Sequence, residues 1–251
     1  MSYIEQNGFF TFDGVKSSDY GVWINGGGTY NAPARRYKEY TVPGRNGSLT
    51  IDEGAFEEID HTYEAFIKDS FSSNIEGFRN QLMARSGYVI LTDSYHTDEF
   101  YRAKYMRGLD VDVAPGGVAG KFDIKFSRDP RRFLVSGGEA VTITGSGSLT
   151  NPTLFSSRPI IRVLAEHEGD WIHGTITIGS DVITIDSDGE DYIDINSETQ
   201  DCYCGIYNVN ESVTFQNNDF PLLSPGVNNV TITTTAGGID RIEITPNWYR
   251  V

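Results

Sequence analysis

Alternation of hydrophobic and polar positions is the clearest signal in the first half of the chain. Phe122, Ile124 and Phe126 alternate with lysine and aspartate, which predicts a strand with one buried face. Residues 36–42 alternate as well, and this pattern predicts a half-buried strand. Strands are predicted in this half at residues 8–14, 20–24, 36–42, 49–52, 88–92, 99–105 and 121–126.

A helical spacing appears between these strands. Ile75, Phe78 and Leu82 recur at positions i, i+3 and i+7, which places them on one face of a helix. Ser73 or Asn74 is a suitable N-cap, and a glycine at position 87 fits the end of the helix. An apolar stripe must cover something, so the first half is predicted to be α+β, with one main helix packed on a sheet.

The second half has a different residue pattern, in which short strand-like runs alternate with turn residues and no amphipathic helix is predicted. Regular short strands of this kind are typical of a β-sandwich or a jelly roll. The predicted fold class is therefore mainly β, with an N-terminal α+β domain and a C-terminal sandwich. The runs are 160–164, 174–178, 182–185, 192–195, 212–215, 229–233 and 239–244.

Turn-rich composition between residues 134 and 157 marks the predicted domain boundary. The prediction is an N-terminal domain over 1–135, a linker region over 136–156 and a C-terminal domain over 157–251. The length of 251 residues is sufficient for two domains of ordinary size.

Charge is unevenly divided between these parts. Residues 1–135 hold 16 basic and 19 acidic side chains, whereas residues 136–251 hold 4 and 16, so that most of the net charge of -15 lies in the second half. Such a surface repels nucleic acid and anionic membranes, and neither is expected as a partner. No apolar run reaches the roughly 18 residues of a membrane span. Residues 1–5 lack the pattern of a cleaved signal peptide.

Candidate chemistry is sparse. The four histidines, His61, His96, His167 and His173, lie in no hydrolase or metalloprotease pattern. The acidic run 186–191 resembles a calcium loop, but strand-like residues flank it where an EF-hand has helices, so a charged hairpin turn is the favoured interpretation. Neither an enzyme activity, a cofactor nor a metal site is expected.

Two cysteines, Cys202 and Cys204, are one residue apart, which gives poor geometry for a disulfide and favours synthesis in a reducing cytoplasm. Trp171 and Trp248 could stack on a sugar, although packing in the sandwich is the favoured interpretation. These tryptophans are the basis of an alternative function, that of a lectin-like module that binds host saccharide.

The segment Val42-Pro43-Gly44-Arg45-Asn46-Gly47-Ser48-Leu49 is a cluster of turn residues between two strand-like runs. Proline fixes one backbone angle, while glycine and asparagine tolerate left-handed conformations. The segment is therefore predicted to be a shaped loop rather than a catalytic pocket.

Several segments, taken in order, resemble the distal tail proteins of long-tailed, non-contractile phages, and they cover nearly the whole chain. Each is weak alone, but their joint order is more specific. Asn247 departs from the pattern, since an arginine more often precedes the tryptophan. The segments are 10–14, 17–21, 42–47, 49–54, 151–153, 158–163, 220–228 and 244–250.

The resemblance implies a structural hub at the tip of a phage tail. It implies a homohexameric ring formed by the N-terminal domain, and a galectin-like C-terminal sandwich. The implied partners are the tail tube protein, the tail-associated tip protein, the tape-measure protein and receptor-binding components, and the implied location is the virion tail tip. We expect the loop to make assembly contacts through Pro43, Gly44, Arg45, Asn46 and Gly47.

Overall fold

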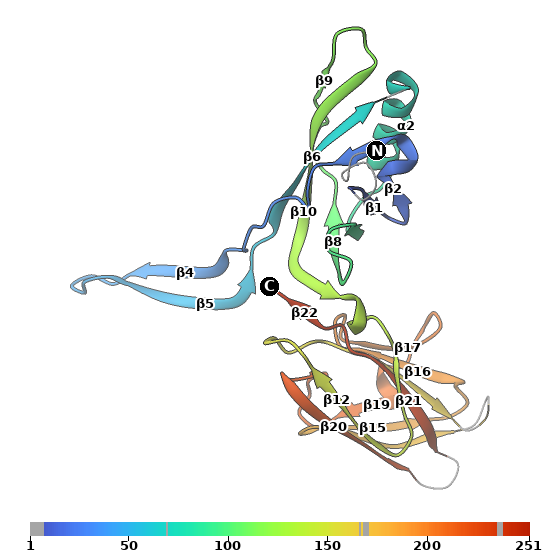
Figure 1. Ribbon diagram of the computed structural model, residues 1–251. Helices are drawn as coiled ribbons and strands as arrows, with labels where there is room; N and C mark the ends of the chain where they lie inside the picture. Colours follow the sequence, from blue (N-terminus) through green and yellow to red (C-terminus); the bar gives the residue numbers. More distant parts are fainter. Residues whose placement is uncertain (1–7, 69, 166, 168–170, 235–237) are drawn as a thin grey trace. The chain divides into compact units, whose positions relative to one another are not determined.

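The computed structural model describes residues 8–68, 70–165, 167, 171–234 and 238–251, so the N-terminal residues 1–5, for which no signal peptide is expected, lie outside the described part. The chain divides into two compact units (Figure 1). The first comprises residues 1–132 together with Val251, and the second comprises residues 133–250. Each unit has its own hydrophobic core.

The first unit is built on a sheet with the strand order β2-β1-β7-β8-β10-β6-β3, and β9 pairs with β10. The long antiparallel ladder between β6 and β10 runs from Lys68 opposite Ala119 to Ile59 opposite Arg128. The strands are β1 Phe10–Phe12, β2 Val15–Lys16, β3 Val22–Ile24, β6 Ile59–Lys68, β7 Val89–Asp93, β8 Glu99–Lys104, β9 Val111–Val113 and β10 Ala119–Leu134, and a short helix η1 covers Ser17–Tyr20.

One α-helix, α2 (Phe71–Met83), packs on this sheet, as the spacing of apolar residues predicts. Phe78 and Leu82 are buried, and the Phe78 ring lies 6.2 Å from that of Phe10. The helix begins after Ser70, three residues before the earlier of the two predicted caps. On β10 the side chains of Phe122, Ile124 and Phe126 are buried in the same core, which confirms the one-sided strand.

The second unit is a β-sandwich, as predicted. One sheet has the order β11-β21-β13-β16-β17-β18 and the other β12-β20-β14-β15-β19, and a single apolar cluster contains residues of both sheets. The strands are β11 Val141–Ile143, β12 Ser146–Asn151, β13 Ile160–Ala165, β14 Ile172–Ile178, β15 Asp181–Ser187, β16 Tyr192–Asn196, β17 Asp201–Cys204, β18 Tyr207–Asn208, β19 Val213–Phe215, β20 Gly226–Thr234, β21 Ile239–Thr245 and β22 Tyr249–Arg250, with short helices η2 Val135–Gly137 and η3 Asn210–Ser212.

The predicted linker over residues 136–156 is where the structure differs from the expected domain organisation. These residues carry β11 and β12, which pair with β21 and β20 and so belong to the two sheets of the sandwich. The division between the units falls instead between Arg132 and Phe133. The glycines and serines that suggest a linker are turns between short strands, as at Gly145, where φ is 78°.

Three segments of the phage-like pattern meet in the second unit through buried hydrogen bonds. The Asn151 amide donates to the Leu223 carbonyl at 3.0 Å, and the Ser157 hydroxyl donates to the Pro246 carbonyl at 2.6 Å. Ser157 and Leu223 also exchange two backbone hydrogen bonds of 3.0 Å. Asn247, the departure from the pattern, has a left-handed φ of 56°, which asparagine tolerates better than most residues. These segments therefore hold the sandwich together.

Candidate assembly interface

The predicted assembly loop is the tip of a long hairpin formed by β4 (Arg35–Thr41) and β5 (Ser48–Phe56), a two-stranded sheet separate from the rest. All seven residues of β4 are exposed, so the prediction of a half-buried strand at this position is wrong. We call residues 35–56 the arm. At its base, the guanidinium of Arg35 lies 4.8 Å from the centre of the Phe56 ring, and the Glu57 N–H donates to the Ala34 carbonyl at 2.8 Å.

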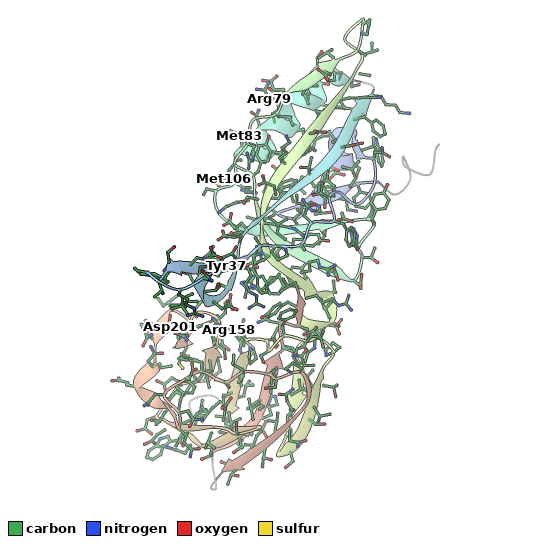
Figure 2. All side chains as sticks on the ribbon, turned by 90° about the vertical axis from the view of Figure 1, so that its left-hand side faces the viewer. Tyr37, Arg79, Met83, Met106, Arg158 and Asp201 are labelled. Carbon is green, nitrogen blue, oxygen red and sulfur yellow. The ribbon has the colours of Figure 1, made fainter. Side chains whose placement is uncertain are left out.

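The two faces of the arm differ in chemistry. Residues paired across an antiparallel ladder share a face, and the register places Tyr40 opposite Leu49 and Lys38 opposite Ile51. Together with Val42 beside the end of β4, these residues form the apolar face, on which Tyr40, Val42, Leu49 and Ile51 are each 38–49% exposed. The opposite face carries Tyr37 (Figure 2), with Glu39, Thr41, Ser48, Thr50 and Asp52.

The sequence alone does not identify this apolar face as a candidate contact surface, although the alternation that produces the face is visible in the sequence. The alternation that predicts a half-buried strand is the alternation that places Tyr40 and Leu49 on one side. Contiguous exposed apolar patches are typical of surfaces that bind other molecules, so this face is a candidate contact surface.

The tip of the arm is a tight turn built by the predicted residues. The Arg45 N–H donates to the Val42 carbonyl at 3.1 Å, and Gly44 and Gly47 both have a φ of 79°. Side chains at either glycine would meet no other atom within 4 Å, so glycine is required there by backbone conformation rather than by space. Pro43 and Asn46 complete the turn between β4 and β5.

Ion pairs cross the arm below its tip. Arg35 meets Asp52 at 2.7 Å, and Lys38 meets Glu53 at 2.8 Å. The pKa of Asp52 is lowered mainly by the hydrogen bond that it accepts from the Gly54 N–H, and then by Arg35. The pKa of Lys38 is raised by Glu53. Exposed pairs like these contribute little stability and mainly favour one register. Arg45 makes no ion pair within the described residues, so the tip presents a free cation.

The structure separates the two tryptophans proposed for saccharide contact. Trp248 is 6% exposed in the core of the sandwich, where it cannot offer a ring face, whereas Trp171 is 60% exposed. The Trp171 ring lies 5.1 Å from that of His173, and His173 contacts Asp186 at 2.5 Å. A saccharide contact at Trp171 stays a prediction, and Trp248 does not contribute to it.

The cysteines and histidines considered as chemical candidates do not form one site. Cys202 is buried and Cys204 partly buried, and both are free thiols. Among the residues described, no three or more histidine, cysteine or acidic side chains are grouped as a metal would require. No described helix combines the length and apolarity needed to cross a membrane. His61 and His96, by contrast, lie in the first unit, where both line one cavity.

Comparison with known proteins finds a solved structure of similar architecture. No protein-family model matches the chain, and no curated protein matches it. Among solved structures, the chain is similar to the Dit protein (gp 19.1) of phage SPP1, with a TM-score of 0.68 and 16% identity over 94% of this chain and 97% of that one. That protein is described as a paradigm of the hub adsorption apparatus in phages infecting Gram-positive bacteria.

A second similarity is weaker. A chain of the phage P2 baseplate, in its activated conformation with Ca, aligns over 95% of this chain and 97% of that one, with a TM-score of 0.48 and 8% identity. At that level it adds no support of its own. The first similarity covers both units and nearly the whole length of both chains, so the chain has the fold of the SPP1 protein.

Proposed function

We propose that this chain is a structural hub protein of a long, non-contractile phage tail tip. The observation that carries the proposal is the shared fold along almost the entire length of SPP1 Dit, whose own description is that of an adsorption-apparatus hub. A fold can serve many functions, but here both units and their order agree. The order of the phage-like segments in the sequence adds independent support.

In the proposed assembly, the first unit forms a homohexameric ring and the arm contributes contacts between its copies. A ring requires a heterologous contact that closes after rotation. Covering four half-exposed apolar side chains on the arm would stabilise such a contact by roughly 3–6 kcal/mol, about half the value of their full burial. Association costs about 4–15 kcal/mol, so the arm must act together with other surfaces of the first unit.

The proposed neighbours of the ring are those of a tail tip. The tail tube protein would stack on one side, and the tail-associated tip protein on the other, with the tape-measure protein in the central hole and receptor-binding components outside. The proposed location is the virion tail tip, after synthesis in the host cytoplasm. The acidic second unit, which supplies most of the net charge of -15, suits an exposed and soluble position. The proposed role is structural rather than catalytic.

Low-resolution images and the solution mass of the purified full chain test this function. A closed ring of about six copies supports it. Since such a protein can require its neighbours to assemble, the same measurements are made with co-expressed tail tube and tip proteins. A chain that forms no ring and binds neither neighbour would contradict the proposal.

The contribution of the arm tip is tested separately with Arg45→Ala. Arg45 is unpaired within the described residues, whereas Arg36 makes an ion pair with Glu57 at 3.2 Å near the base of the arm, so Arg36→Ala is the matched control. We expect Arg45→Ala to weaken assembly more than the control does. Full rings with normal binding of tail partners in Arg45→Ala would show that the assignment of residues 43–47 to assembly contacts is wrong.

A further inference from the structure

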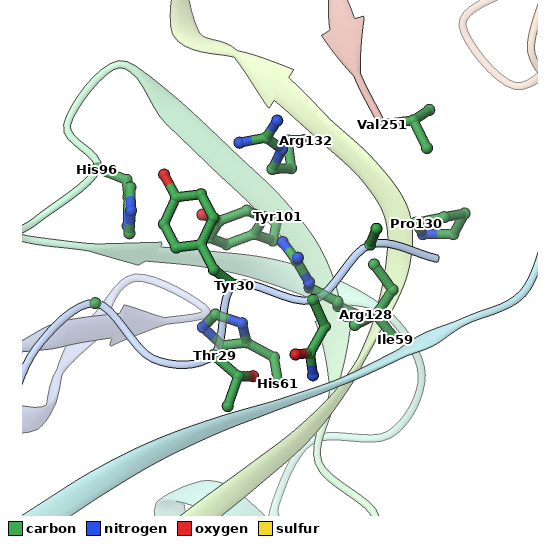
Figure 3. A pocket seen from close by; sticks show the side chains of 13 residues that line it. Thr29, Tyr30, Ile59, His61, His96, Tyr101, Arg128, Pro130, Arg132 and Val251 are labelled. Atoms are coloured by element: carbon green, nitrogen blue, oxygen red, sulfur yellow. The ribbon is translucent and has the colours of Figure 1, made fainter. Parts of the chain in front are cut away.

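A cavity of about 140 Å³ lies in the first unit, between β6, β8, β10 and the segment that leads into the arm (Figure 3). One water molecule requires only about 10–15 Å³ of such volume, so the space accommodates a small organic group. Its polar side chains are basic or neutral, and none of the lining side chains is acidic. The side chains that matter most are Tyr30, His61, Tyr101, Arg128 and Arg132.

Arg128 is the main feature of this cavity. The residue is 3% exposed, and its Nε and Nη1 atoms have no hydrogen-bond partner among the described residues. Its guanidinium lies 4.5 Å from the centre of the Tyr101 ring, which offsets part of the cost of burial. A buried charge without a partner is strongly unfavourable, so the site lacks an anion that would accept from these nitrogens.

The neighbouring charges limit the anion to a single negative charge. Arg132 also lines the cavity, but it is paired with Glu99 at 3.4 Å. Asp93 is not among the lining residues, and its carboxylate contacts His96 Nδ1 at 3.0 Å and accepts a hydrogen bond of 2.8 Å from the Tyr63 hydroxyl. Arg128 is therefore the one unpaired cation among the described residues that line the cavity.

His61 adds a second unsatisfied group. It is 2% exposed, and neither ring nitrogen makes a hydrogen bond of normal geometry to the described residues. Burial, and then Arg128, lower its pKa to about 4, against smaller opposing effects of Asp93 and the Thr29 backbone. The ring is thus neutral at pH 7 and can offer one N–H to an anion without adding charge.

Two glycines bring the backbone close to the histidines. A Cβ at Gly28 would lie 2.5 Å from His61 Nε2, and a Cβ at Gly27 would collide with the His96 ring. Three glycines at 26–28 have a composition typical of a flexible connector, but Gly27 and Gly28 are packed against this site. Gly27 and residues 29–32 line one side of the cavity, and Tyr30 and Asn31 among them are exposed.

We propose that this cavity binds one carboxylate group, with Arg128 and His61 donating hydrogen bonds to its oxygens. A single unpaired cation favours a carboxylate over a doubly charged phosphate. Ile59 and Pro130 in the wall suit a short aliphatic stem behind the carboxylate. The proposal is independent of the hub function and rests on the first unit alone.

Such a carboxylate has two possible sources, a small free carboxylic acid or an aspartate or glutamate side chain of a second copy of the chain. Titration of the full-length protein with sodium propionate, followed by NMR of the Arg128 Nε–H resonance, tests the shared chemistry. Sodium chloride at equal ionic strength is the control. We expect a saturable shift with propionate and none with chloride. Self-association, measured in the same samples, separates the sources.

Propionate that binds without affecting self-association indicates a free acid as the occupant. Propionate that binds and weakens self-association indicates an acidic side chain, and so does an Arg128 resonance that shifts only as the protein associates. An Arg128 resonance that responds to neither propionate nor protein concentration would mean that the cavity holds water alone, and this would overturn the proposal.

A pair of variants checks the assignment to Arg128. Arg128→Met removes the charge and should lower the affinity for propionate by at least about tenfold, because hydrogen bonds to charged groups are the strong ones. Arg107→Met is the control, since Arg107 is an exposed residue paired with Asp60 at 2.7 Å, and its affinity should remain within about twofold. The titration of the unmodified protein decides the question even if Arg128→Met fails to fold.

Discussion

Tyr40 on β4 lies directly opposite Leu49 on β5, and both side chains are exposed on the apolar face of the arm. Their contact across the strands cannot bury either one, because a two-stranded sheet has no second layer. Tyr40 and Leu49 therefore present an apolar surface without contributing much buried area to the stability of the fold.

The double variant Tyr40→Ser/Leu49→Ser should consequently weaken assembly while changing the free energy of unfolding by no more than about 0.5 kcal/mol, as for other exposed sites. Solution mass reports the first effect and denaturant unfolding the second. Tyr37→Ser, on the opposite face of the arm, is the control and should assemble normally. Equal loss of assembly in both variants would remove the apolar face from the proposed interface.

Glu58 should make the first unit sensitive to acid. It accepts hydrogen bonds from Lys104 at 2.7 Å, from Ser127 at 2.6 Å and from Tyr88, and these lower its pKa to about 2, with Lys104 as the largest cause. A lowered carboxylate pKa stabilises the fold above the unfolded value of 4.5, and this contribution is lost as the pH falls from about 5 towards 2.

Because the Glu58 side chain is 37% exposed, solvent screening reduces the expected contribution to about 1 kcal/mol. Glu58→Gln should therefore be less stable than the unmodified protein at pH 7 and nearly equal to it near pH 2, as measured by chemical denaturation. Glu57→Gln, which disrupts an exposed pair with Arg36, should have little effect at either pH. A difference at Glu58 that does not change with pH would contradict this account.

Gly28→Ala should destabilise the first unit by roughly 2–4 kcal/mol, because it combines a left-handed backbone with overpacking. The φ of Gly28 is 77°, and an added Cβ would lie 2.5 Å from His61 Nε2. Gly26 has a φ of 90° but no atom within 4 Å of an added Cβ, so Gly26→Ala measures the backbone cost alone. Equal stability of the two variants would show that the close approach to His61 is unimportant.

The two thiols should react at very different rates. Cys202 is fully buried, and burial raises its pKa to about 12, so it has almost no thiolate at pH 8. Cys204 is partly exposed. Alkylation followed by mass spectrometry should show one modified thiol in the native protein and two after denaturation. Labelling of both at similar rates in the native state would disprove the buried position of Cys202.

Where a residue pattern is satisfied within the chain, the sequence predicts the structure well. Phe122, Ile124 and Phe126 are buried on one side of β10, and Phe78 and Leu82 cover the sheet from α2. The sandwich follows for the same reason, since its strands bury their apolar sides against each other. These patterns are local, and each requires only a neighbouring layer to cover it.

The long strand β6 is not predicted from the sequence, although its burial alternates from Ile59 to Ile67. Its inward positions include His61, a polar residue, and its outward positions include Phe66, so hydrophobicity alone blurs the period. The cavity escapes prediction for a different reason. His61, Tyr101 and Arg128 come from three strands, and no spacing along the chain indicates that they meet.

The arm shows a third limit of prediction from sequence. The alternation around Tyr40 correctly indicates two unlike faces, but the prediction that β4 is half-buried assumes that the covering layer belongs to the same chain. A pattern of residues specifies that a face is to be covered without specifying which molecule covers it.

In the proposed assembly, the apolar face of the arm stays uncovered until a neighbouring copy binds, and during that time it is exposed to aggregation. Two exposed strand edges beside a row of apolar side chains are a template for non-specific pairing and aggregation. Lys38, Arg45 and Glu53 place charges along that face and at its tip, where charge discourages stacking in the wrong register. In the proposed assembly, the same few charged residues thus have to prevent non-specific contacts before the correct neighbour is present. They must also permit the specific contact once that neighbour binds.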